Sequence, residues 1–286
     1  MEMLDGKVIQ SVMQSQLLAR LSEIEILSTI DSTNRYTLEK KLPVSSSASV
    51  SSFPVASMTS PEQPQTAYVC IAEEQTAGRG RQGNHWISPK ASNLYLSLLW
   101  RFPSSFSISN LSLASGVAMA NALRRYGLEA VKLKWPNDVI YAGRKLAGIL
   151  VETTNESNGM IRAVIGIGLN IAMPANVETI DQPWIDIQTI TGAVNATHQL
   201  RNQLAAWLIE ELLLMLPVFE AQGFSAFRSA WEMLDGLHGC EVTINTPHGS
   251  VHGKAVGIDV NGSLLVECGD ITHRFHYGDV HVRRTV

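Results

Sequence analysis

Residues 73–86 of the chain read EEQTAGRGRQGNHW and directly follow an apolar run, Ala67 to Ala72, that predicts a β-strand. The three glycines of this stretch leave the backbone free to approach a ligand closely. Its two arginines carry permanently charged donors suited to carboxylate or phosphate oxygens, and Trp86 can wall an apolar pocket. On these residues alone, a loop that closes over a small anionic ligand and a solvated basic turn are equally good interpretations.

Composition limits the classes of protein to consider. The 286 residues suffice for one sizeable core, or for one large and one small domain, and 45% hydrophobic with 17% charged residues is ordinary for a globular protein. The net charge of −4 argues against a dedicated nucleic-acid-binding protein. Cys70, Cys240 and Cys268 lie far apart without a CxxC pair, which indicates free thiols in a reducing compartment.

Two segments bear on location and order. Residues 1–20 lack the apolar centre of a signal peptide, and no apolar run is long enough to span a membrane, so we expect a cytoplasmic protein. Residues 43–65 are dominated by serine and proline without a clear period, which predicts a flexible insertion.

The remaining pattern predicts an α+β fold with a mixed β-sheet and helices on one face. Helices are expected at 8–21, from Ser32 or Thr33 to about 42, and at 111–126, 198–219 and 224–234. Strands are expected at 23–30, 67–72, 92–101, 131–135, 139–141, 145–152 and 162–170. Five further short strands, at 240–244, 249–259, 263–267, 271–276 and 280–284, predict a small β-barrel, so we divide the chain into domains 1–235 and 236–286.

Five motifs then give the chain a specific resemblance. They read DSTN at 31–34, EEQTAGRGR at 73–81, KWPND at 134–138, RKLAGILVE at 144–152 and GIGLN at 166–170. In this order they resemble the catalytic core of biotin–protein ligases. The resemblance implies a catalytic domain like that of class II aminoacyl-tRNA synthetases, followed by a small SH3-like domain. About two dozen residues precede the core, so we expect the type without a DNA-binding repressor domain, and no operator binding.

The resemblance also implies a two-step reaction. Biotin and ATP with Mg²⁺ give biotinyl-5′-adenylate and pyrophosphate, and the biotinyl group then passes to a lysine of a carrier protein. The implied carrier is the biotin carboxyl carrier protein of acetyl-CoA carboxylase or a similar protein. Some relatives dimerise through the edge of the central sheet, so the expected state is a monomer or a weak homodimer.

Site residues follow from the motifs, position by position. The expected catalytic residues are Lys145, Arg81 and Lys134. Biotin is expected to contact Ser32, Thr33, Asn34, Gln75, Arg79, Gly80, Arg81, Trp86, Lys145 and Gly148. ATP or the adenylate is expected to contact Arg79, Arg81, Lys134, Asn137, Asn170 and Trp184, with Asp138 as a ligand of ATP-bound magnesium.

Simpler roles compete with these assignments. Ser32 or Thr33 can cap a helix, Trp86 can be a core residue under the loop, and Lys145 can be an exposed residue at a hairpin end. Asn84 and His85 stand where many relatives carry more basic residues, which makes this loop less positive.

Two alternative functions remain. One is a lipoate ligase or octanoyltransferase of the same fold, although their glycine-rich, histidine-containing signature is absent from the sequence. The other is an arginine-loop module that binds nucleic acid, which the net negative charge disfavours.

Overall fold

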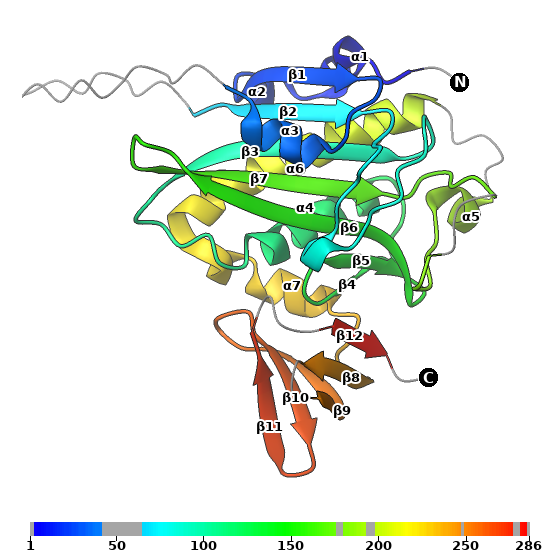
Figure 1. Cartoon of the computed structure of the whole chain (residues 1–286), viewed down its shortest axis with the longest axis vertical. Helices are drawn as coiled ribbons and strands as arrows, with labels where there is room; N and C mark the ends of the chain where they lie inside the picture. The colour runs from blue at the N-terminus through cyan, green and yellow to red at the C-terminus, as the bar shows by residue number, and fades with distance from the viewer. Residues whose placement is uncertain are drawn as a thin grey trace, which may run out of the picture.

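The computed structural model describes residues 3–41, 65–175, 180–192, 198–246, 249–276 and 281–284. Apart from Gln65, the predicted insertion at 43–65 lies outside the described residues. The described chain forms a large mixed sheet with helices and, at the C-terminal end, a small second sheet (Figure 1).

The large sheet has seven strands in the order β1-β2-β3-β7-β6-β5-β4. Its strands are β1 (Leu21–Leu27), β2 (Ala67–Ala72), β3 (Leu94–Pro103), β4 (Lys132–Lys134), β5 (Asp138–Tyr141), β6 (Arg144–Asn155) and β7 (Met160–Leu169). Strands β1 and β2 are parallel, and the other neighbours are antiparallel, so the predicted mixed sheet is confirmed.

The two faces of the sheet serve different purposes. The long helices α4 (Leu111–Arg125) and α6 (His198–Gln222) pack on one face and enclose the main apolar core, as expected. The short helix α3 (Thr33–Glu39) lies on the opposite face, over β3 and β7, which Figure 1 shows in front of the sheet. Among the described residues, a small apolar cluster around Tyr68, Cys70, Leu99 and Val164 lies on that second face.

Helix α3 has a polar buried side. Ser32 is its N-cap, and the Ser32 hydroxyl accepts from the Arg35 amide at 3.5 Å, so the predicted capping role is confirmed. The buried residues of the helix are Thr33, Asn34 and Thr37. A helix that buries polar side chains against a sheet needs hydrogen-bond partners there, and these partners belong to the site described below.

The predicted helix at 8–21 is wrong, because two short helices, α1 (Gly6–Val12) and α2 (Ser15–Leu18), replace it. The break is stabilised by tertiary structure: the Gln14 amide donates to the Glu210 carboxylate of α6 at 2.5 Å. Similarly, the helix predicted at 224–234 divides into η2 (Gly223–Ala226) and α7 (Arg228–Leu234). The structure adds η1 (Arg81–Gly83) and α5 (Ile187–Thr191), which the sequence pattern did not indicate.

The five predicted C-terminal strands are confirmed as one antiparallel sheet in the order β11-β10-β9-β8-β12. They are β8 (Glu241–Thr246), β9 (Gly249–Ile258), β10 (Leu264–Cys268), β11 (Ile271–Phe275) and β12 (His281–Arg284). None of the described helices combines the length and apolar character needed to cross a lipid bilayer.

The small sheet docks beside strand β4. The Trp135 indole N–H donates to the Gly262 carbonyl at 2.9 Å, and the Gly236 amide donates to the Leu133 carbonyl at 2.7 Å. Asn110, the residue before α4, has a left-handed backbone and donates its side-chain amide to the Asn261 carbonyl at 2.7 Å instead of capping the helix. The contact between the two sheets therefore overrides a local helix-capping preference.

A buried ion pair fixes the root of the Gly/Arg loop (residues 73–86) to α6. The carboxylate of Glu73, at the end of β2, meets the Arg201 guanidinium at 2.6 Å, and their side chains are 0% and 4% exposed. The same carboxylate accepts from the Leu4 amide at 2.5 Å, and Arg201 Nε donates to the Asn93 carbonyl at 3.1 Å.

We predict that Arg201→Met lowers the free energy of unfolding by about 3–5 kcal/mol, because it leaves the Glu73 charge buried without its partner. Urea unfolding measures the change. Adding Glu73→Gln to that variant removes the charge and should recover a large part of the loss. A loss below about 1 kcal/mol for Arg201→Met alone would contradict this role of the ion pair.

Candidate active site

The floor of the site consists of glycines on neighbouring strands. In the strand register, Gly148 of β6 faces Gly168 of β7, and Gly166 of β7 faces both Leu150 of β6 and Ser97 of β3. Alternation along the strands puts these positions on the face that carries α3, away from α4 and α6. A patch of sheet nearly free of side chains results.

Two neighbours lie directly on this floor. A Cβ atom added at Gly168 would lie 2.3 Å from Trp86 Cε2, and one at Gly166 would lie 2.1 Å from Asn34 Oδ1. Both distances are impossible for real atoms, so neither position accepts a side chain unless Trp86 or Asn34 moves. Glycines inside strands often mark such a close approach of another group to the backbone.

The Gly/Arg loop folds back on itself before it covers the floor. The Trp86 amide donates to the Gly78 carbonyl at 2.9 Å, and the Gly80 amide donates to the Asn84 carbonyl at 2.7 Å. The turn at η1 has positive φ at Gln82 and Gly83, where a glycine relieves the strain. The loop is thus a small hairpin with Trp86 on its inner side.

A cavity of about 1190 Å³ lies between the floor, the loop, α3 and the segment 180–184. Every residue that the sequence suggested for the site lines it: Ser32, Thr33, Asn34, Gln75, Arg79, Gly80, Arg81, Trp86, Lys134, Asn137, Asp138, Lys145, Gly148, Asn170 and Trp184. The structure therefore brings residues of all five motifs together around one cavity.

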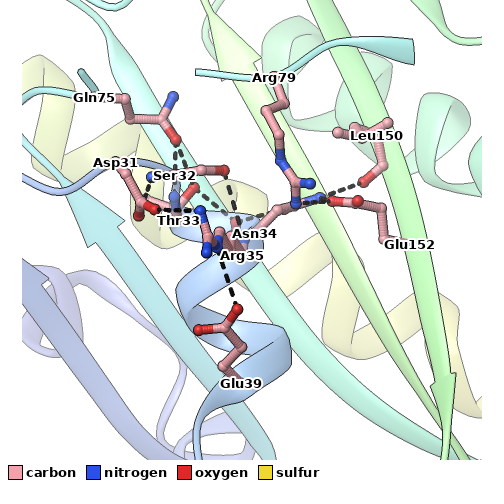
Figure 2. A network of polar contacts seen from close by, with 11 residues as sticks. Asp31, Ser32, Thr33, Asn34, Arg35, Glu39, Gln75, Arg79, Leu150 and Glu152 are labelled. Carbon is pink, nitrogen blue, oxygen red and sulfur yellow. Dashed lines mark hydrogen bonds and ion pairs between the residues drawn. The ribbon is translucent and has the colours of Figure 1, made fainter. Parts of the chain in front are cut away.

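A polar network of oriented amides and hydroxyls fills the α3 end of the cavity (Figure 2). The Gln75 side-chain carbonyl accepts from the Thr33 amide at 2.9 Å and from the Thr33 hydroxyl at 3.1 Å, while its NH₂ group donates to Ser88 at 2.9 Å. The Ser97 hydroxyl lies 2.8 Å from the Thr33 hydroxyl and 2.6 Å from Asn34 Oδ1. Such an end suits a ligand head that both donates and accepts hydrogen bonds.

Positive charge gathers at the other end of the cavity. Lys145 Nζ lies 2.7 Å from Asp138 Oδ1 and 5.3 Å from the centre of the Trp86 ring, with the Lys145 and Asp138 side chains 16% and 13% exposed. A cation so placed over an aromatic face gains further electrostatic stabilisation. Arg81 Nη1 lies 3.5 Å from Asn137 Oδ1, and the Asn137 amide group donates to the Ile149 carbonyl at 2.8 Å.

The segment that carries Trp184 is attached to the beginning of β6. The Lys145 amide donates to the Pro183 carbonyl, and the Ile185 amide donates to the Lys145 carbonyl, both at 2.9 Å. The Asn170 side-chain amide donates to the Ile185 carbonyl at 3.3 Å. Asn170 therefore fixes backbone in this structure, and Trp184 lies next to Lys145 in the sheet pairing.

Sequence reasoning missed three polar residues of the site: Ser88, Ser97 and Glu152. Ser97 was the detectable one, because a serine inside the apolar run 94–99 is unusual unless it has partners. The Glu152 carboxylate contacts both Asn34 and Arg79, as Figure 2 shows, although it was quoted only as the last letter of a motif.

Comparisons with known proteins agree with this geometry. Residues 54–170 match the Biotin/lipoate A/B protein ligase family, and residues 237–283 match the Biotin protein ligase C terminal domain. The chain is 37% identical to the Bifunctional ligase/repressor BirA of Escherichia coli K12, over 96% of this chain and 79% of that protein. It is 30% identical to the Biotin--[acetyl-CoA-carboxylase] ligase of Paracoccus denitrificans, over 68% and 82% of the two chains.

A solved structure is similar over nearly the whole chain. The biotin protein ligase from Aquifex aeolicus in complex with biotin and ATP superposes with a TM-score of 0.73 at 25% identity. The match covers 93% of this chain and 100% of that one.

We predict that Gly168→Ala displaces Trp86 and costs about 1–3 kcal/mol of stability, because the new methyl group overlaps the indole ring. Near-ultraviolet circular dichroism and urea unfolding report the two effects. Gly6→Ala is the matched control, since its Cβ would meet only ordinary contacts at 3.7 Å or more. An unchanged Trp86 environment in Gly168→Ala would contradict the described close contact.

Proposed function

The chain belongs to the biotin protein ligases, and on this premise we propose that it activates biotin with ATP and biotinylates a carrier protein. The observation that supports this most directly is the single cavity that joins an amide-rich end, a glycine floor and a cationic end. Biotin has the matching chemistry, with a urea-like head, an apolar tail and a carboxylate.

The biotin head would bind at the α3 end. Gln75, Thr33 and Asn34 offer fixed donors and acceptors there, and Ser32 lines the cavity beside them. The tail would cross the glycine floor at Gly148 under the Trp86 ring, where Gly80 of the loop also lines the cavity. The contact of Trp86 with Gly168 is compatible with both interpretations of Trp86, as a wall of the cavity and as a core residue under the loop.

The first step would take place beside Lys145. A biotin carboxylate oxygen attacks the α-phosphorus, the bond to the β-phosphate oxygen breaks, and pyrophosphate leaves. Two anions must approach each other, so preorganised positive charge lowers the barrier. Lys145 is a compact cation held between Asp138 and Trp86, and it can follow charge from the carboxylate to the phosphate. Arg81 and Lys134, which also line this cavity, would bind the phosphates.

The second step transfers the acyl group. The neutral amine of a carrier lysine attacks the carbonyl carbon of the adenylate, the bond to the AMP oxygen breaks, and a proton leaves the nitrogen. The Gly/Arg loop over the cavity would keep water from the mixed anhydride until the carrier arrives. We propose the biotin carboxyl carrier protein of acetyl-CoA carboxylase as that carrier.

The nucleotide would lie towards Asn137, Asn170 and Trp184, with the Trp184 ring available to stack on adenine. Among the described residues, no group of three or more His, Cys, Asp or Glu side chains could hold a metal ion, and Asp138 already pairs with Lys145. The oxygen atoms of Asp138 and Asn137 are too few to hold a magnesium ion alone. They fit an ion that the triphosphate holds largely by itself. Such an ion supplies charge neutralisation on the phosphates.

Two observations disfavour the octanoyltransferase and the nucleic-acid module. The described residues that line the cavity include no cysteine for a thioester-forming transferase, and burial raises the pKa of the Cys70 thiol to about 12. A nucleic-acid module would need an exposed basic surface, whereas Lys145 is paired within the cavity.

Further features of the proposal concern the whole chain. We propose that it does not bind operator DNA, since α1 and α2 bury Ile9 and Leu17 in the main core instead of forming a separate unit. We propose a cytoplasmic location, which agrees with the free thiols. We also propose a monomer or weak homodimer. The domain boundary would lie at 235/236, between α7 and β8.

Biotin-dependent exchange of labelled pyrophosphate into ATP tests the proposed activity. We predict exchange that requires biotin, and transfer of the label from biotin to a purified carrier domain. Exchange stimulated by lipoate and not by biotin would overturn the proposal in favour of a lipoate ligase. Salt-sensitive RNA binding without any exchange would favour the nucleic-acid module instead.

We further predict that Lys145→Ala lowers the rate of this exchange about 10²–10³-fold while the chain remains folded, because it removes charge stabilisation of the transition state. Lys132→Ala is the control, since Lys132 is an exposed lysine two residues from Lys134. Full activity of Lys145→Ala would exclude its catalytic role.

A further inference from the structure

Glu152 stands at the meeting point of the sheet, α3 and the Gly/Arg loop. Its Oε2 atom accepts from Arg79 Nη2 at 2.8 Å and from Asn34 Nδ2 at 2.9 Å. The side chains of Glu152 and Arg79 are 26% and 40% exposed, so their ion pair is partly shielded from water. Figure 2 shows the Arg79 side chain extended from the loop towards this carboxylate.

The sheet side of this contact is rigid. Glu152 belongs to β6, and its partner Asn34 is buried against Gly166. The Asn34 amide group also donates to the Leu150 carbonyl at 3.1 Å, while its carbonyl lies 2.6 Å from the Ser97 hydroxyl. The carboxylate is therefore fixed in place, and the loop is the movable partner.

The same network holds the other end of the loop. From Asn34 the contacts continue through Ser97, Thr33 and Gln75 to the Ser88 hydroxyl, which donates to the Trp86 carbonyl at 3.0 Å. One continuous set of polar contacts thus begins at Arg79 and ends at Trp86. Loss of the Arg79 contact removes the link between the hairpin and β6, whereas the Ala77 amide still donates to the Asp31 carbonyl at 2.9 Å.

Electrostatics favours the ion pair between Arg79 and Glu152 over a contact of Arg79 with phosphate. If the guanidinium turned to a substrate phosphate, the Glu152 carboxylate would remain partly buried without its cation, which is unfavourable. Arg81, by contrast, extends towards Asn137 at the cationic end, where the Arg81 and Asn137 side chains lie 3.5 Å apart. The two arginines of the loop therefore have different neighbours and different tasks.

We propose that Glu152 is a positioning residue that keeps residues 78–86 closed over the cavity, and that the Arg79 side chain acts through Glu152 instead of binding phosphate. The effect on catalysis rests on the proposed function, whereas the contact between Glu152 and Arg79 does not. It replaces the expected contact between Arg79 and the adenylate. It also gives Glu152 a role, which the motif comparison did not assign to it.

Hydrogen exchange in the full chain without substrates tests the contact. Amides of residues 78–86 should exchange about ten-fold faster in Glu152→Ala and in Arg79→Ala, and no faster in the double variant than in either single one. Glu232→Ala is the matched control, because it breaks an equally short pair with Arg228, 2.8 Å long, on α7. Unchanged exchange of 78–86 in both single variants would overturn the proposal.

Enzyme kinetics test the consequence. Each single variant should raise the KM for biotin and the release of free adenylate about ten-fold, with a smaller change in kcat, and the double variant should match the single ones. Arg79→Lys should restore part of the loss, since an ammonium can still pair with Glu152. Additive effects of the two substitutions on kcat would show that Arg79 acts on the phosphates and would overturn the proposal.

The two readouts separate two kinds of failure. An unsubstituted chain without biotin-dependent exchange would contradict the proposed function, and hydrogen exchange would then decide the Glu152–Arg79 contact by itself. Normal activity of the unsubstituted chain together with unaltered loop exchange in the variants would contradict only this further inference.

Discussion

The absence of side chains at Gly148, Gly166 and Gly168 is the constraint on which the site depends. Because these positions carry no Cβ, Trp86 and Asn34 lie on the backbone of the sheet, and the loop and α3 enclose a cavity between them. Glycine inside a strand costs roughly 0.5–1 kcal/mol relative to alanine, so three of them weaken the sheet locally. The apolar core under α4 and α6, on the opposite face, offsets this loss.

This division of the sheet explains where polar and charged groups occur. One face buries apolar side chains against two long helices, and the other carries hydroxyls, amides and paired charges. Within the second face the charges are also separated. Lys145 with Asp138 lies at one end, and Glu152 with Arg79 lies by α3. In the proposed function, the Lys145–Asp138 pair assists the chemistry and the Arg79–Glu152 pair positions the loop. The same type of ion pair thus has a different role at each place.

Local sequence signals were sufficient where the chain interacts mainly with its own neighbours. The strand Ala67–Ala72, the two strands on either side of Gly143 and the five C-terminal strands follow from period and turn residues. The signals failed where a distant residue decides the outcome. Glu210 stabilises the break at Gln14, Asn261 binds the Asn110 side chain in front of α4, and Glu152 binds Arg79 across 73 positions of sequence. Periodicity carries no information on such partners, because they lie far apart in the sequence.

The most direct test of the account is a crystal structure with biotin and a non-hydrolysable ATP analogue bound. The account predicts biotin across the Gly148–Gly168 floor beneath Trp86, its head at Gln75 and its carboxylate within hydrogen-bond distance of Lys145 Nζ. Arg79 would still contact Glu152. Biotin bound elsewhere, or a carboxylate remote from Lys145 with that lysine still paired only to Asp138, would contradict it.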